Sequence, residues 1–293
     1  MFQEEGDGKD KQRLTHLRDG EQDDGVFYTE RICIFGYGSK RTQEKVAVCV
    51  CYLKGGSQQH GEQEEDSHLL ALEQHQCIQS ESGYKVVPER IEGGILGSVV
   101  PALTGRVLGA LRMLCSARFL TVGPGLKSGI KLRLDNPAQL GAELLCGAVA
   151  ALEEGPGPLA VISADTAISI MAVNGKQELV GGVILPGPQL SLSALVQKTA
   201  QLPQIDLSAP ASSSILGKNT SACLQNGFVL GTAGLLDGLA ERFQAELGPD
   251  IRFYATGNLP RTIREACRTP IQYREYLITD GLYRIWQRNR KGG

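Results

Sequence analysis

A short glycine-rich loop follows a predicted strand near the middle of the chain. The apolar run 118–122 is typical of a strand, and it continues directly into Gly123, Pro124 and Gly125, with Lys127 shortly after. A strand that ends in a glycine loop is a common ligand-binding geometry, because binding residues often sit on loops held by a rigid scaffold. The same residues also fit a tight surface turn followed by a solvated lysine. The pattern indicates a candidate binding loop, and its surroundings must decide between the two interpretations.

The elements before this loop are predicted to be a strand hairpin, a further strand and a helix. The apolar runs 32–35 and 46–53 flank a glycine-containing turn, which is typical of a hairpin. The run 94–100 predicts a buried strand, and Thr104 is a candidate N-cap of the next helix. Residues 1–25 carry almost no apolar side chains, so they cannot bury enough surface to offset the entropy of ordering. We expect a disordered leader there.

The elements after the loop alternate between helices and strands. Apolar residues at helical spacing predict a helix that ends at the run Gly155–Pro158, and a strand follows. The predicted strands 167–173 and 178–185 are joined around Asn174 and Gly175, which is a strong signal for a two-residue hairpin turn.

One long helix is predicted from Asn219 or Thr220 to Gly248. The apolar residues along one side of it are Leu224, Phe228, Leu235, Leu239, Phe243 and Leu247. Four interior glycines recur on a single stripe of this helix, and each costs about 1 kcal/mol relative to alanine. The stripe consists of Gly227, Gly231, Gly234 and Gly238. That cost makes sense if another backbone approaches the stripe closely. Packing within the core and a subunit interface both satisfy this condition.

The order of these elements predicts the fold class and the domains. Strand pairs, then helices, then a second set of strands and helices indicate a duplicated α/β architecture with two lobes and a ligand cleft between them. We divide the chain into a leader 1–25, an N-terminal domain 26–117 and a C-terminal domain 118–293.

Composition disfavours several classes of partner. The formal net charge is −2 and the pI is about 6.1, so no broad cationic field attracts nucleic acid or an anionic membrane. The N-terminal segment is polar, and no apolar run is long enough to span a bilayer. Eight cysteines are scattered through a chain without an export signal, which favours reduced thiols. We expect a cytoplasmic protein with no nucleic-acid or membrane partner.

Several short motifs follow one another in a specific order from Ser98 to Gly257. They are Ser98-Val99-Val100-Pro101, Val122-Gly123-Pro124-Gly125-Leu126-Lys127, Asp135-Asn136-Pro137, Gly141-Ala142-Glu143, Gly181-Gly182, Pro186-Gly187, Thr199-Ala200-Gln201-Leu202-Pro203, Gly217-Lys218-Asn219-Thr220 and Ala255-Thr256-Gly257. In order and spacing they resemble the signature of type III pantothenate kinases. Each motif alone is weak, but their shared order is specific.

The resemblance implies a fold, a reaction and an assembly. The fold is a duplicated actin-like, ribonuclease-H-like ATPase fold. The family reaction transfers the γ-phosphoryl group of ATP to pantothenate, giving 4′-phosphopantothenate in the first step of coenzyme A biosynthesis. The resemblance also implies Mg²⁺ and a monovalent cation, K⁺ or NH₄⁺, as cofactors, and a dimer in which pantothenate lies near the subunit interface.

On the substrate side the family positions are kept. The resemblance carries a pantothenate-binding role to Gly123, Pro124, Gly125, Lys127, Gly141 and Thr199. Thr199 matches a threonine that reaches into the neighbouring subunit's pantothenate site, and it also fits a residue that ends its own helix.

On the nucleotide side the chain departs from the family. The family turn Asp-x-Gly-Asn-Thr matches here only at Gly38, so the carboxylate that approaches the metal is missing. In a second turn Asp165 stands before Thr166 in place of a glycine. In the adenine-side loop Gly257 is kept, but Asn258 replaces the next glycine. Asp165 is a candidate relocated metal ligand, although its bulk and charge favour impaired phosphate binding.

The catalytic pair also differs from the family pattern. The family has an Asp-Arg pair, in which the Asp accepts the proton of the substrate hydroxyl and the Arg holds the substrate. Here the pair is Glu143-Leu144. Glu143 is a candidate general base, but its extra methylene displaces the carboxylate, and an error of ~1 Å can cost on the order of 100-fold in rate. Glu143 equally fits a helix first turn, where the dipole favours a negative charge, and Leu144 cannot replace a guanidinium.

Three functions follow from this pattern of kept and lost residues. The first is a kinase-like subunit that forms a heterodimer with a catalytically intact type III pantothenate kinase chain, so that ATP and its cations are bound by the complex. The second is a self-sufficient divergent kinase, as a homodimer, that uses Asp165 for metal and Glu143 as base. The third is a non-catalytic regulatory or binding protein. The better preservation of the substrate side favours the first.

Overall fold

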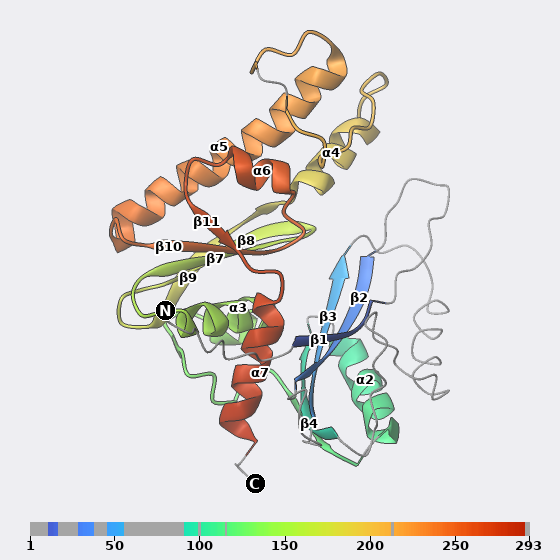
Figure 1. Cartoon of the computed structure of the whole chain (residues 1–293), viewed down its shortest axis with the longest axis vertical. Coiled ribbons are helices and arrows are strands. Elements are labelled where there is room, and N and C mark those ends of the chain that lie inside the picture. Colours follow the sequence, from blue (N-terminus) through green and yellow to red (C-terminus); the bar gives the residue numbers. More distant parts are fainter. Residues whose placement is uncertain are drawn as a thin grey trace, which may run out of the picture. The chain divides into compact units, whose positions relative to one another are not determined.

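In the computed structural model of the chain, the described residues are 11–16, 29–37, 46–55, 91–98, 101–114, 116–211 and 214–290 (Figure 1). The chain divides into two compact units. Unit 1 comprises residues 1–127, 141–143 and 282–293, and unit 2 comprises 128–140 and 144–281. The predicted domains were two continuous stretches that meet between residues 117 and 118. The compact units are instead discontinuous, because unit 1 also contains the C-terminal residues 282–293. In the part of the chain that is described, no helix is both long and apolar enough to cross a lipid bilayer.

The described strands of unit 1 form one sheet in the order β1-β2-β3-β4-β5. They are β1 (Lys11–His16), β2 (Thr29–Tyr37), β3 (Val46–Gly55), β4 (Ile91–Ser98) and β5 (Arg118–Thr121). β1, β2 and β3 pair antiparallel, which confirms the predicted hairpin, and β3, β4 and β5 pair parallel. β1 lies within the predicted leader 1–25, whose disorder stays a prediction. The rest of 1–25 lies outside the described residues.

The helix α2 (Pro101–Leu114) follows β4. It begins at Pro101 and not after Thr104, so the predicted cap is wrong. A proline suits the first helical turn because its φ is already helical and its missing N–H is not needed there. The Thr104 hydroxyl instead donates a hydrogen bond to Ser98 Oγ at 3.0 Å. This bond ties the helix to the end of β4.

The core of unit 1 is built on β4. Ile95 and Leu96 are fully buried, and Val107 of α2 is almost so. Gly93 leaves space for the indole of Trp286, because a Cβ at this position would lie 3.2 Å from Trp286 Nε1. Trp286 lies on α7 (Leu277–Asn289), the C-terminal helix. The N-terminal and C-terminal parts of unit 1 are thus held by direct packing.

The strands of unit 2 form a second sheet in the order β11-β10-β7-β8-β9-β6. They are β6 (Lys131–Leu132), β7 (Leu159–Ala164), β8 (Ala167–Val173), β9 (Glu178–Pro186), β10 (Arg252–Gly257) and β11 (Ile271–Tyr273). β7, β8 and β9 form an antiparallel meander, and β10 and β11 add parallel strands on the other side of β7. This is the ribonuclease-H-like arrangement that the resemblance implied, so the predicted α/β class is confirmed.

Helices cover both faces of this sheet, as Figure 1 shows for α3 and α5. The helices of unit 2 are η2 (Pro137–Gln139), α3 (Ala142–Glu153, of which the first two residues belong to unit 1), α4 (Pro188–Gln197), α5 (Thr220–Leu247) and α6 (Arg261–Ala266). Successive residues of β7 point to opposite faces of the sheet. Ile162 packs against buried residues of α5, whereas Val161 faces Gly147 of α3. β7 is therefore buried on both sides, which explains its continuous apolar run.

The helix α5 begins and ends where the sequence predicted. Asn219 caps it by accepting a hydrogen bond from the Ala222 N–H at 2.8 Å, and Gly248 ends it with φ +106°. Its buried face agrees with most of the prediction, because Leu224 is buried and Leu239, Phe243 and Leu247 pack against the core of unit 2. Leu235 departs from it with 43% exposure, and the neighbouring Leu236 is buried instead.

The glycine stripe of α5 does not pack within unit 2. Gly227, Gly231 and Gly234 are exposed, and a Cβ at any of them would meet no described atom within 4 Å. The core-packing interpretation is therefore wrong for these three positions. The subunit interface stays a prediction.

The turn between β8 and β9 comprises residues 174–177, as the predicted strand bounds imply, and not the two residues of an Asn-Gly turn. It spans four residues because Asn174 organises it: its Oδ1 accepts the N–H groups of Lys176 at 2.9 Å and Glu178 at 3.0 Å. Gln177 adopts φ +58°. An asparagine side chain that replaces a backbone acceptor can support a longer loop than an Asn-Gly pair alone suggests.

Candidate functional site

Two predicted nucleotide-side segments meet at the carboxyl ends of β7 and β10. These strands are parallel, and Ala164 pairs with Gly257 in register. The residues that follow them, Asp165 and Asn258, must therefore emerge side by side. Asn258 Nδ2 donates a hydrogen bond to Asp165 Oδ1 at 2.9 Å. Two of the departures from the family pattern thus contact each other directly.

The backbone beneath this pair is closely packed. The Asn258 N–H donates to the carbonyl oxygen of Ala164 at 2.5 Å. Gly257 has φ +82°, and a Cβ there would lie well under 3.0 Å from the same oxygen. The position therefore requires glycine for both its conformation and its space. Tyr273 also stabilises this turn, because its hydroxyl donates a hydrogen bond to the Gly257 carbonyl oxygen at 2.9 Å.

The end of β9 completes this corner of unit 2. The Gly187 N–H donates to the carbonyl oxygen of Thr166 at 2.8 Å. A Cβ at Gly187 would lie well under 3.0 Å from the carbonyl oxygen of Asp165. Pro186-Gly187 was one of the motifs of the family resemblance, but no site role was predicted for it. A glycine directly after a predicted strand was the sequence signal that could have indicated one. Asp165 is partly exposed and Thr166 is exposed, so the corner is open to solvent.

A stacked arginine lies behind Tyr273. The guanidinium carbon of Arg264 lies 3.8 Å from the centre of the Tyr273 ring, in cation–π geometry. Arg264 Nε is buried, and no described residue accepts its hydrogen bond. The ring contact is thus the interaction that orients this side chain. The chain of contacts from Arg264 through Tyr273 to Gly257 supports the turn from inside unit 2.

The described residues contain no group of three or more His, Cys, Asp or Glu side chains that could hold a metal ion. Asp165 is therefore the one member of the nucleotide-side set that could contribute a carboxylate, and its Oδ1 is already bonded to Asn258. Hard cations such as Mg²⁺ usually need one or two carboxylates in addition to phosphate oxygens and water. Gly38, the remaining nucleotide-side prediction, lies outside the described residues.

The predicted substrate loop belongs to unit 1. Gly123, Pro124, Gly125 and the Lys127 side chain are exposed, and Gly125 has φ +92°. The loop is anchored at its far end by Asn289 of α7. The Lys127 N–H donates to Asn289 Oδ1 at 3.0 Å, and Asn289 Nδ2 donates to the Lys127 carbonyl oxygen at 3.0 Å. Sequence reasoning missed Asn289, because its partner is distant in the chain.

The pair Glu143-Leu144 lies in the first turn of α3. Glu143 is partly exposed, and Gly141 just before the helix is also partly exposed. Leu144 is only 8% exposed and contributes to the core. The position at which the resemblance implied a substrate-holding arginine is therefore apolar and turned inward.

Thr199 lies just beyond α4. Its hydroxyl donates to the carbonyl oxygen of Leu195 at 2.9 Å, within one turn of the same helix. The prediction that Thr199 helps to end its helix is confirmed. The residue is also exposed, so a role toward a partner chain stays a prediction.

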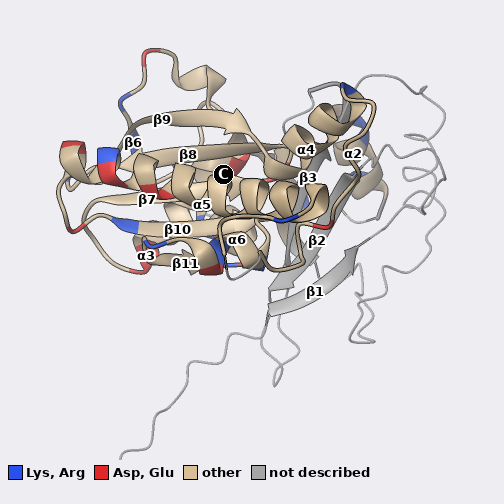
Figure 2. Cartoon of the chain, turned by 90° about the horizontal axis from the view of Figure 1, so that it is seen from above, with Lys and Arg blue, Asp and Glu red and all other residues tan. Residues whose placement is uncertain are grey.

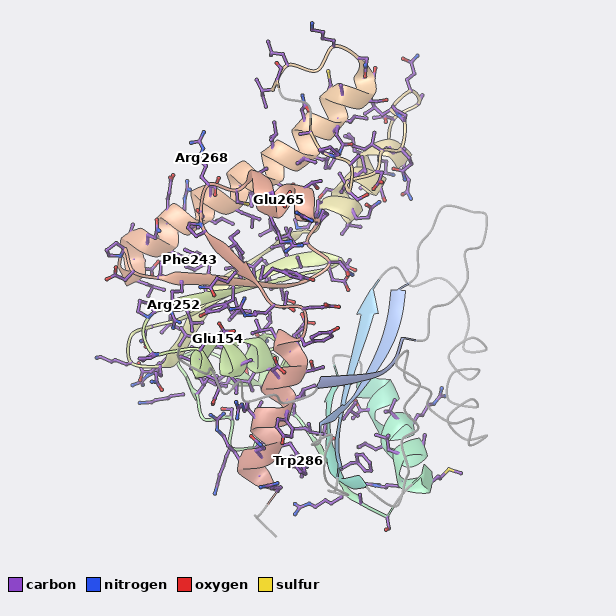
Figure 3. All side chains as sticks on the ribbon, in the orientation of Figure 1. Glu154, Phe243, Arg252, Glu265, Arg268 and Trp286 are labelled. Atoms are coloured by element: carbon purple, nitrogen blue, oxygen red, sulfur yellow. The ribbon has the colours of Figure 1, made fainter. Side chains whose placement is uncertain are left out.

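Three charged residues of unit 2 form contacts near the C-terminal end of α3. Arg252, the first residue of β10, donates to the Gly155 carbonyl oxygen at 2.6 Å, and Figure 3 shows it beside Glu154. Glu154 accepts both hydrogen bonds of a bidentate pair with Arg274, each 2.8 Å long. Figure 2 shows Lys and Arg residues interspersed with Asp and Glu residues along the described ribbon. The contacts of Arg252 and Arg274 therefore fit a structural role, in which they stabilise the end of α3.

Comparison with known proteins gives consistent similarities. A family model for type III pantothenate kinases matches residues 42–242. The type III pantothenate kinase of Koribacter versatilis (strain Ellin345) is 38% identical over 204 residues, covering 68% of this chain and 72% of the relative. The corresponding protein of Exiguobacterium sp. (strain ATCC BAA-1283 / AT1b) is 35% identical over 203 residues, covering 69% and 79%.

Solved structures show weaker similarity. A conserved Campylobacter jejuni protein, assigned to the Baf family of transcriptional activators, is 17% identical with a TM-score of 0.40, covering 88% of this chain and 94% of its own. An activator of 2-hydroxyisocaproyl-CoA dehydratase from Clostridium difficile is 11% identical with a TM-score of 0.39, covering 90% and 96%.

Proposed function

Because this chain belongs to the type III pantothenate kinase family, we propose that it is a kinase-like subunit that acts with a catalytically intact chain of the same family. The complex converts ATP and pantothenate to 4′-phosphopantothenate in the cytoplasm. Mg²⁺ and a monovalent cation, K⁺ or NH₄⁺, are bound by the complex. In this proposal the present chain supplies contacts on the substrate side and the partner supplies the phosphate and metal contacts.

The observation that carries the proposal is the bond between Asn258 and Asp165. Phosphoryl transfer depends on positioning and on neutralising the charge of the transferred group. Here the one carboxylate of the nucleotide-side corner is engaged by an amide at 2.9 Å, and the described residues hold no group of three or more His, Cys, Asp or Glu side chains that could bind a metal. A magnesium ion bound to phosphates gains few ligands from this corner, which favours a partner that supplies the others.

The buried Leu144 supports the same conclusion on the catalytic side. A guanidinium offers five hydrogen-bond donors in a fixed plane, and an inward-facing leucine offers none. Glu143 can still accept a proton in principle, but it belongs to unit 1 while Asp165 belongs to unit 2. A self-sufficient kinase would need both residues in new roles.

Two exposed features support a partner chain. The stripe of Gly227, Gly231 and Gly234 on α5 leaves its backbone open to close approach by another helix. Leu235, next to Gly234 on the same helix, is 43% exposed, and Leu195 on α4 is 38% exposed, so both helices present an apolar side chain to solvent. Thr199 follows α4 directly, and in this proposal it contacts pantothenate held by the partner.

The experiment compares the purified chain with a co-purified pair. The chain is expressed alone and together with an intact family kinase of the same genome, and each preparation receives ATP, Mg²⁺, K⁺ and pantothenate. We expect 4′-phosphopantothenate from the pair and none above the blank from the chain alone. The intact kinase expressed alone is the control, because activity that does not change when the present chain is added would contradict a shared site. Robust turnover by the isolated chain would refute the proposal.

A further inference from the structure

The turns after β7 and β10 are fastened to each other by side chains as well as by backbone. Ligands of open α/β sheets bind outside the carboxyl ends of the strands, which is where Asp165 and Asn258 lie. The pair is part of the exposed rim and not of the core. Its 2.9 Å bond therefore spans the place where a ligand would approach both turns.

Backbone contacts hold the two turns together beneath the pair. The Asn258 N–H donates to the Ala164 carbonyl oxygen, and the Gly187 N–H donates to that of Thr166. A Cβ at Gly257 or at Gly187 would lie well under 3.0 Å from a carbonyl oxygen. The side chains of Asp165 and Asn258 lack such close packing, so a ligand that needs this space would displace them before the main chain.

The Asp165 side chain places a carboxyl group at this rim. It accepts a hydrogen bond from the Asn258 amide, and it forms no ion pair with a lysine or arginine among the described residues. A phosphoryl group beside a carboxylate meets a like charge, and such a repulsion grows as a site loses water.

We propose that the Asp165–Asn258 pair is a specificity determinant that excludes nucleoside triphosphates from this corner. The inference rests on the proposed function, because it assumes that the corner is the nucleotide side of a family subunit. It goes further in one respect: within the described part of the corner, it assigns the obstruction to these two side chains, so replacing them should tighten binding of a triphosphate.

The test measures binding of MgATP to the full chain by calorimetry. The variants are Asp165→Asn, which removes the charge while keeping the size, and Asp165→Gly combined with Asn258→Gly, which removes both charge and bond. We expect Asp165→Asn to tighten binding and the double variant to tighten it by tenfold or more, which corresponds to about 1.4 kcal/mol. Raising the salt concentration should strengthen binding to the wild-type chain relative to Asp165→Asn, because salt screens the repulsion.

Glu265→Gln is the matched control. It removes one carboxylate charge from the same unit, from an exposed pair with Arg261, without contacting Asn258. Binding that tightens no more in the Asp165 variants than in Glu265→Gln overturns the inference, as does tight binding by the wild-type chain that Asp165→Asn weakens. If the glycine variant fails to fold by circular dichroism, Asp165→Asn and the salt series decide alone. Failure of the proposed function is distinguishable, because it would appear as turnover by the wild-type chain.

Discussion

The glycines of two helices predict opposite effects of one substitution. Gly281 lies within α7, and a Cβ there would lie well under 3.0 Å from the carbonyl oxygen of Cys146 on α3. Gly231 lies within α5, where a Cβ would meet no described atom within 4 Å. Alanine at Gly231 should therefore add only its helix propensity, whereas alanine at Gly281 must force two backbones apart.

The magnitudes follow from these two environments. Gly231→Ala should raise the free energy of unfolding by about 0.5–1 kcal/mol, because the unfolded chain loses conformational freedom and no contact is disturbed. Gly281→Ala gains the same propensity but must overcome an overpacked contact with backbone, which typically costs about 1–3 kcal/mol or more. We expect a net destabilisation of at least about 1 kcal/mol.

The assay is urea unfolding followed by far-ultraviolet circular dichroism, with both variants and the wild-type chain under identical conditions. The midpoint should rise for Gly231→Ala and fall for Gly281→Ala. Gly231→Ala should also weaken co-purification with the partner chain, since the added methyl group obstructs close approach to the stripe. A Gly231→Ala variant that loses stability as an isolated chain would refute the account of α5, and an unchanged Gly281→Ala would refute that of the α3–α7 crossing.

Three further predictions concern single side chains. Tyr273→Phe removes the hydrogen bond to Gly257 and should lower the free energy of unfolding by about 1 kcal/mol, with faster amide exchange in that turn and not elsewhere in the sheet. The Glu178 pKa is lowered to about 2 by the Asn174 side chain and neighbouring cations, so its contribution to stability is present above the ordinary carboxyl pKa of 4.5 and is lost as the pH falls from there through about 2. Acid unfolding of Glu178→Gln should accordingly be less steep over this range than that of the wild-type chain, and equal slopes would contradict the assignment. Thr199→Ala should reduce the turnover of the co-purified pair while Thr199→Ser preserves it, and equal activity of the two would remove Thr199 from the partner's site.

The sequence predicted the elements of unit 2 well because their local signals agree. β7 is a continuous apolar run that ends at a turn, and α5 has a capping asparagine at one end and a glycine at the other. The apolar spacing also oriented most of α5 correctly, since Leu224 is buried and Leu239 and Phe243 pack against the core. It was wrong at Leu235, which is exposed while Leu236 is buried, because adjacent leucines fit the helical period almost equally well.

The site was predictable in its residues but not in its contacts. Motif order identified Asp165, Gly257 and Asn258, yet the bond between Asp165 and Asn258 depends on the parallel register of β7 and β10, which are distant in the sequence. Asn289 was missed for the same reason, since it holds Lys127 from the other end of the chain. Such long-range pairings carry no local pattern.

The account's central claim is tested most directly by the initial rate of phosphoryl transfer from ATP to pantothenate with this chain as the sole protein, at saturating Mg²⁺ and K⁺. A rate indistinguishable from that of the protein-free blank is the predicted result. Sustained formation of 4′-phosphopantothenate in proportion to the concentration of this chain would contradict the claim that a second subunit completes the site.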